Sequence, residues 1–288
     1  MTAPLVDAAW QPSALELSRR ALRRRATVWS VLLALLSSLI VAAVLVIVIA
    51  NTPGWKVVRE TFFDPEVALA SVGPIFQGLL LNIVVLLISA VCVALLGTLL
   101  AVLRSLRGPV FFPLRLLAAA YTDFFRGVPL LIVLYLVGFG IPALMIFPRM
   151  PAMFWGTIAL VISYSAYVAE VLRAGMEAVH PSQRLAARSL GLSHAKTLRL
   201  VVLPQAIRKV TPALMNDFVS MQKDVGLVSI LGAVDAVRSA QIAQAETYNF
   251  TPYFVAGLLF VVISLPLIRV TDAIARRQQR REQIGGTV

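Results

Sequence analysis

Long stretches without a charged residue constrain this chain more than any other feature of its sequence. Residues 28–50 form an apolar run that contains no Asp, Glu, Lys or Arg. A helix needs about 20 such residues to cross a hydrocarbon layer roughly 30 Å thick, because each residue advances it by about 1.5 Å. Across the chain 59% of residues are hydrophobic and 14% are charged, against roughly half and a quarter in soluble domains. The sequence therefore predicts an all-α protein that crosses a membrane several times.

Basic residues gather at the ends of the apolar runs. They form four groups, at residues 19–25, 104–126, 173–209 and 269–281. The segments between them carry acidic residues and few basic ones. Since loops rich in Lys and Arg stay in the cytoplasm, this alternation assigns a side to each loop. The net charge of +12 thus follows from membrane topology, and nucleic acid is not an expected partner.

Hydropathy and loop charge together predict six membrane spans with both termini in the cytoplasm. The predicted spans are residues 28–50, 76–103, 115–147, 152–174, 207–234 and 251–272. In the third span, glycines and prolines from position 138 onward suggest that the helix stops near Val137, before an irregular outer segment. Residues 1–27 and 273–288 are expected to be basic cytoplasmic tails, and residues 51–74 an external loop.

The fifth predicted span carries polar and charged residues among apolar ones. Such side chains are costly in lipid, so we expect them to face a protein interior or a passage. Together with one asparagine of the second span, they give a set of candidates for the translocation path. The set is Asn82, Asn216, Ser220, Gln222, Lys223 and Asp224. The alternative is that Lys223 pairs with an acidic residue on a neighbouring helix and simply holds the bundle together.

The basic segment 176–209 is predicted to form two short cytoplasmic helices around a glycine. Ser182 is a suitable N-cap for the first helix, and Gly191 can supply the left-handed residue that ends it. Ser193 can cap the second helix, and Pro204 is expected to end it and to let the next span begin.

Small side chains on the first of these helices favour a docking role. Ala186 and Ala187 on its surface would let the backbone of a partner protein approach closely, with Arg184 and Arg188 beside them for polar contacts. An amphipathic helix that lies on anionic lipid headgroups would have a similar composition.

The spacing within this segment resembles the EAA loop of ABC-importer permeases. Leu185-Ala186-Ala187 is followed after three residues by Gly191, and nine residues later by Val201-Val202-Leu203-Pro204. Leu185 stands where the family has its name-giving Glu. Further stretches resemble the branch of that family that takes up polar amino acids. These stretches are residues 125–131, 167–175, 203–206 and 223–224.

The resemblance covers about residues 75–270 and implies both a fold and a function. The fold would be a type I ABC importer permease-like helical bundle, with a core of five helices at residues 75–272 and an extra helix at residues 28–50. The chain would be the permease subunit of an ATP-driven importer in the bacterial plasma (inner) membrane, and would move amino acids, polar ones in particular, into the cytoplasm. The residues expected to couple it to the ATPase are Leu185, Ala186, Ala187, Arg188, Gly191, Leu203 and Pro204.

The resemblance also implies a set of partners. Two ATPase subunits, a second permease that is identical or homologous, and an external solute-binding protein would complete the transporter. No catalytic residue and no cofactor are expected in this chain, so ATP and Mg²⁺ would bind to the ATPase. Lys196-Thr197 lacks the preceding glycine of a phosphate-binding loop. His180 and His194 are too far apart to suggest a metal site, and the single Cys92 rules out a disulfide framework.

Two other function classes compete with this interpretation. A secondary transporter or channel driven by an ion gradient could use the ionisable residues inside the membrane, which are Glu170, Asp217, Lys223 and Asp224. Such a carrier has no need of a docking loop. The segment from Leu185 to Thr197 also has the residue pattern of a DNA-binding helix-turn-helix, but it would be tethered to the membrane at both ends and would lack the helices that form that motif's core.

Overall fold

A computed structural model gives the fold and describes residues 13–106 and 108–285 of the chain. The described residues form helices and turns and contain no strand. They divide into two units, one that ends at Arg59 and one that begins at Glu60.

The first unit consists of α1 (Ala14–Ala50) and most of α2 (Trp55–Phe62). Ser13 caps α1, because its side chain accepts a hydrogen bond from the Glu16 N–H. The described side chains of α1 are exposed along its whole length. This agrees with the first predicted span, and the helix starts 14 residues before it, within the basic segment.

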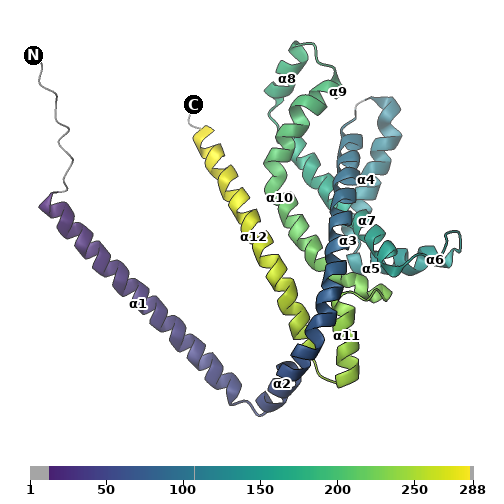
Figure 1. The fold of residues 1–288 in the computed structure, drawn as a ribbon. Helices are drawn as coiled ribbons and strands as arrows, with labels where there is room; N and C mark the ends of the chain where they lie inside the picture. Colours follow the sequence, from purple (N-terminus) through teal and green to yellow (C-terminus); the bar gives the residue numbers. More distant parts are fainter. Residues whose placement is uncertain (1–12, 107, 286–288) are drawn as a thin grey trace, which may run out of the picture. The chain divides into compact units, whose positions relative to one another are not determined.

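The second unit is a helical bundle built on α3 (Pro65–Ser105) and α7 (Ala152–Glu177), which pack closely against each other (Figure 1). Asp64 caps α3 by accepting hydrogen bonds from the N–H groups of Glu66 and Val67. The main hydrophobic core lies between α3, α7 and α10 (Leu203–Asp224). The last helix, α12 (Thr251–Gly285), packs against both α3 and α10.

The third predicted span contains a sharp break that the sequence analysis placed wrongly. A short turn, η1 (Pro109–Phe111), leads into α4 (Phe112–Gly127), and the chain then turns by 108° before the next helical segments. These segments are α5 (Leu130–Tyr135), the π-turn η2 (Leu136–Gly140) and α6 (Ile141–Ala143).

Proline chemistry explains why the break lies at Val128–Pro129 and not near Val137. Val128 is extended, with φ −97° and ψ 128°, because a following proline disfavours the helical conformation. The expected stop near Val137 is wrong, since the chain remains helical to Ala143. Pro142 follows directly after the π-turn η2, and this wider turn lets the helix continue past a residue that has no N–H to donate.

The fifth predicted span, residues 207–234, lies within a bent pair of helices that extends beyond it at both ends, since the pair runs from His194 to Thr247. After α10, the 3₁₀-helix η4 (Val225–Leu231) ends at Gly232 with φ +87°, and α11 (Ala236–Thr247) follows at 51° to the preceding segment. Asp235 caps α11 by accepting a hydrogen bond from the Arg238 N–H.

The described helices agree with the predicted number of crossings. Four are long and apolar enough to span a membrane, and the count rises to six if each of the two bent pairs is one span. Within the bundle, α8 (Pro181–Ser189) and α9 (His194–Thr197) lie at one end and α11 at the opposite end (Figure 1). The basic loops place the α8 end in the cytoplasm.

Candidate functional site

The predicted coupling loop is two helical segments joined at a glycine. Gly191 has φ +78°, which confirms the left-handed residue after α8. Ser193 accepts a hydrogen bond from the Lys196 N–H, as expected of an N-cap. The cap of α8 differs from the prediction, because it is His180 whose Nδ1 accepts from the Ser182 N–H. Pro181 fills the first helical position, so the capping position falls one residue earlier than the next serine.

Pro204 does not end the second segment, contrary to the expectation. The backbone stays helical from His194 through η3 (Leu198–Val202) into α10. The turn η3 is a π-turn, in which the Leu203 N–H bonds to the Leu198 carbonyl five residues back. This wider turn precedes a proline that has no N–H of its own to donate. The second half of the loop is therefore continuous with a core helix.

The exposed surface of α8 is more apolar than the sequence suggested. Ala186 is exposed but Ala187 is 4% exposed, so the prediction of Ala187 as a surface residue is wrong. A helix has an inner and an outer face, and adjacent residues 100° apart fall on different ones. Leu185 and Leu190 are 67% and 83% exposed. Leu190, which the sequence analysis did not select, could have been found as a large apolar residue directly before the helix-ending glycine.

Basic side chains fasten this loop to the ends of the core helices. Arg184 donates to the Met176 carbonyl at the end of α7, and Lys209 Nζ donates to the Ala178 carbonyl at 2.7 Å. Arg188 Nη1 donates to the Leu192 carbonyl at 3.3 Å across the glycine turn. These bonds favour movement of α8 together with α7 and α10. A contact with an ATPase remains a prediction for the seven selected loop residues.

A cluster of ionised side chains joins three helices near the same end. Glu170 of α7 forms ion pairs with Arg104 of α3 at 2.8 Å, Arg126 of α4 at 3.6 Å and Arg173 of α7 at 2.6 Å. Arg173 also pairs with Glu177. Glu170 thus belongs to a cytoplasmic-side network of fixed charges, and its carboxylate is surrounded by guanidinium groups.

A polar pocket of about 230 Å³ lies where α7 and α10 meet the break after α4. Its lining residues are Val128, Leu130, Ser163, Tyr164, Tyr167, Asp217, Ser220 and Asp224. The Tyr164 hydroxyl donates to Asp224 Oδ2 at 2.7 Å. Asp217 Oδ2 is buried and has no hydrogen-bond partner within the described part of the chain.

This pocket contains two of the six residues predicted for the translocation path, Ser220 and Asp224. Ser163, Tyr164 and Tyr167 also line it but were not among the predicted path residues. The sequence does contain a signal for them, because Tyr167 follows Tyr164 by three residues and Ser163 by four. Polar side chains at this spacing share one face of a helix, here within the fourth predicted span.

The other four predicted path residues lie outside this pocket. Asn216 and Lys223 are exposed, and Lys223 forms no ion pair with any described residue. Gln222 is 2% exposed and accepts a hydrogen bond from the Ser264 hydroxyl at 2.6 Å. It therefore links α10 to α12. The alternative of a Lys223 ion pair is not seen in the described residues.

Asn82 is the centre of a second buried contact. Its amide nitrogen donates to Asp235 Oδ2 at 3.0 Å and to the Val225 carbonyl at 3.2 Å. Its amide oxygen accepts from the Ala236 N–H at 3.1 Å. The side chain is 2% exposed, so it ties the η4–α11 turn to α3.

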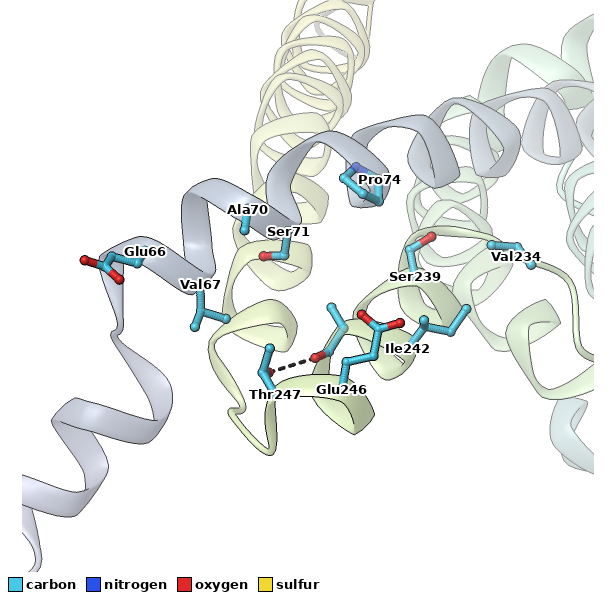
Figure 2. Close-up of a pocket in the computed structure, with 11 residues that line it drawn as sticks. Glu66, Val67, Ala70, Ser71, Pro74, Val234, Ser239, Ile242, Glu246 and Thr247 are labelled. Atoms are coloured by element: carbon cyan, nitrogen blue, oxygen red, sulfur yellow. Dashed lines mark hydrogen bonds between the residues drawn. The ribbon is translucent and has the colours of Figure 1, made fainter.

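A larger pocket, of about 560 Å³, lies between the start of α3 and α11 at the end of the bundle opposite the coupling loop. Figure 2 shows the Glu246 carboxylate projecting from α11 into the space between the helices, with Glu66 at the outer end of α3. Ser71, Ser239 and Thr247 also line it. No basic residue is among its lining residues in the part of the chain that the structure describes.

The bundle, its bent spans and the cytoplasmic loop define a multi-pass membrane permease. Residues 94–280 match the family described as the binding-protein-dependent transport system inner membrane component. The chain belongs to this family: it is the permease subunit of an ABC importer in the inner membrane and not the ATPase. Such systems also require an ATPase and a solute-binding protein.

Similar proteins and solved structures support this assignment. The chain is 34% identical over 205 residues to the arginine transport system permease protein ArtQ of Bacillus subtilis, covering 70% of this chain and 91% of that protein. It is 33% identical to the probable glutamine ABC transporter permease GlnM of the same organism, with 64% and 84% covered. A crystal structure of an amino acid ABC transporter with histidines matches at 36% identity and a TM-score of 0.64, covering 71% of this chain and 94% of that one. The MetNI methionine transporter shares the fold at 16% identity and a TM-score of 0.60.

Proposed function

We propose that this permease imports amino acids with a positively charged side chain, and that Asp217 and Asp224 receive the charged group on the way through the membrane. The observation that carries the proposal is the pocket between α7 and α10, whose lining has two carboxylates and, among the described residues, no basic one. An amino-acid substrate is consistent with the relatives named for arginine and glutamine transport and with the solved transporter described with histidines.

The geometry of the two carboxylates favours a cation over a neutral amide. Asp217 has a buried oxygen without a hydrogen-bond partner among the described residues, and such a group gains most from a charged donor. Tyr164 occupies one oxygen of Asp224 and so holds that carboxylate in place. A guanidinium or ammonium group would meet preorganised acceptors there, with Ser163 and Ser220 beside it for further hydrogen bonds.

The acidic residues at the outer end of the bundle would also favour a positively charged solute. Glu66 and Glu246 line the external pocket, and carboxylates at an entrance raise the local concentration of cations. A second candidate, transport of neutral amide-bearing amino acids, is supported by the glutamine-named relatives. Asparagine and serine side chains would suit that solute, but Asn82 is fully used in hydrogen bonds within the bundle.

In the proposed cycle, two copies of the permease, or this chain and a homologue, stand on two ATPase subunits and receive the solute from an external binding protein. ATP and Mg²⁺ bind to the ATPases and none is held by this chain. Closure of the ATPase pair would move α8, and because α8 is bonded to α7 and its loop is continuous with α10, the pocket walls would move with it as a rigid body.

Uptake by the complete transporter in proteoliposomes tests the proposal. With its binding protein present, Asp217→Asn should lower the uptake of L-arginine about tenfold or more, as expected for loss of a charged hydrogen-bond partner. Asp123→Asn, at an exposed position on α4, is the matched control and should transport normally. Equal arginine uptake by the Asp217 variant and the wild type, or wild-type transport of glutamine in preference to arginine, would refute the assignment.

A further inference from the structure

We propose that the first three turns of α1 form a binding surface for anionic phospholipid headgroups at the cytoplasmic face of the membrane. This helix lies outside the family match, which begins at residue 94, so the transport core does not account for it. Its sequence carries Arg19, Arg20, Arg23, Arg24 and Arg25 within seven residues, directly before an uncharged run.

The charges of this segment are largely uncompensated. Arg20 pairs with Glu16, with 3.1 Å between Nε and Oε1. Within the described part of the chain, Arg19, Arg23, Arg24 and Arg25 form no ion pair and donate no side-chain hydrogen bond. Arginines of the bundle differ, since Arg104, Arg126 and Arg173 share Glu170. Arg19, Arg23, Arg24 and Arg25 therefore have side-chain donors that no described residue occupies, and these can bind an external anion.

The length of α1 places these donors at the depth of the headgroups. Residues 26–50 span about 37 Å at 1.5 Å per residue, enough to cross a hydrocarbon layer of roughly 30 Å with some tilt. Arg25 then stands at the cytoplasmic boundary and Arg19 about 9 Å further out, within the headgroup layer and its immediate surroundings. Trp29, 66% exposed and one turn inside Arg25, is the residue type found at that interface.

The arrangement on the helix suits phosphate groups. Arg19, Arg20, Arg23 and Arg24 are spaced at i, i+1, i+4 and i+5, so they share one face. Each guanidinium can donate two parallel hydrogen bonds to a phosphate. A run of basic residues immediately cytoplasmic to a spanning helix is also attracted by the negative surface potential of the membrane. Charge complementarity therefore selects anionic over zwitterionic lipid as the occupant of this surface.

Lipid enrichment around the purified full-length chain tests this inference. The chain is placed in nanodiscs of phosphatidylcholine with a minor fraction of phosphatidylglycerol, and the lipids retained by the protein are quantified by mass spectrometry. The wild type should enrich phosphatidylglycerol, and the enrichment should fall as salt is raised. In the triple variant Arg19→Gln, Arg23→Gln, Arg24→Gln, the phosphatidylglycerol enrichment should fall by up to roughly fivefold for each arginine removed.

Two further variants separate this surface from other basic segments. Replacement of the same three arginines by lysine retains the charge and should retain most of the enrichment. The pair Arg276→Gln and Arg277→Gln, exposed residues of α12, should leave it unchanged. Labelling of Ser13→Cys in a Cys92→Ser background verifies that α1 keeps its orientation. Undiminished phosphatidylglycerol enrichment in the triple glutamine variant overturns the proposal.

Discussion

Gly78 of α3 lies against the start of α11, and its lack of a side chain allows the two helices to approach closely. A Cβ at this position would stand 2.3 Å from the carbonyl carbon of Asp235 and 2.5 Å from the nitrogen of Ala236. One turn further along α3, Asn82 bonds to the Asp235 carboxylate and the Ala236 N–H. Close approach and hydrogen bonding therefore fix the start of α11 against α3.

We predict that Gly78→Ala destabilises the bundle by about 1–3 kcal/mol, because the neighbouring atoms are backbone and cannot move aside. Gly73 is the matched control in the same helix, since a Cβ there meets nothing within 4 Å. Gly73→Ala should be neutral or stabilising by about 0.5–1 kcal/mol. Thermal unfolding in detergent measures both, and equal midpoints for the two variants would contradict the account of this contact.

The Glu170 network makes a second prediction at the residue scale. Glu170→Gln removes the negative charge from among three arginines and should destabilise the protein by about 1–3 kcal/mol, the range for hydrogen bonds to charged groups. Glu177→Gln is the control, because Glu177 is 65% exposed and contacts Arg173 alone among the described ion pairs. If the Glu170 variant lost less stability than the Glu177 variant, the junction of the three helices would not be stabilised by these charges.

At the scale of elements, the turn at Gly191 connects an exposed docking helix to a core helix. Its φ of +78° is unfavourable for a residue with a Cβ by roughly 1 kcal/mol or more, and most unfavourable for a β-branched one. Gly191→Val should therefore misplace α8 and lower the amount of solute transported per ATP hydrolysed, with membrane insertion unchanged.

Asparagine tolerates the left-handed conformation better than valine, which supplies the control for this turn. Gly191→Asn should therefore retain most of the coupling. If only the space around residue 191 mattered, the Asn and Val variants would lose coupling alike. Apart from its chain neighbours, no described residue has an atom within 4 Å of the position that a Cβ at Gly191 would take, so these variants test backbone conformation and not crowding. Normal coupled uptake in the valine variant would contradict the role given to the loop.

At the scale of the whole molecule, the arrangement of bent spans predicts which positions each side of the membrane can reach. In a Cys92→Ser background, a cysteine introduced at Ser193 should react with a membrane-impermeant reagent from the cytoplasmic side alone. A cysteine at Thr247, an exposed residue at the end of α11, should react from the external side alone. Labelling in inverted and right-side-out vesicles measures both, and reaction of the two positions from one side would reject the six-span topology.

Local patterns determined a large part of this protein. Uncharged runs and basic loops gave the number and direction of the spans, because burial of backbone in lipid requires helices of a set length. The glycine at position 191 and the cap at Ser193 were also readable, since backbone conformation depends mainly on the residue itself. The spacing of the loop further identified the family to which the chain belongs.

Tertiary structure alone decided which polar residues face a pocket and which hold helices together. Asn82 and Gln222 look like path residues in the sequence, yet each is 2% exposed and bonded to a neighbouring helix. Tyr164 becomes part of the polar pocket because α7 lies against α10, where its hydroxyl reaches Asp224. A sequence reveals that a polar side chain must avoid lipid, but the partner that satisfies it lies 42 or more residues away in these three cases and is fixed by how the helices pack.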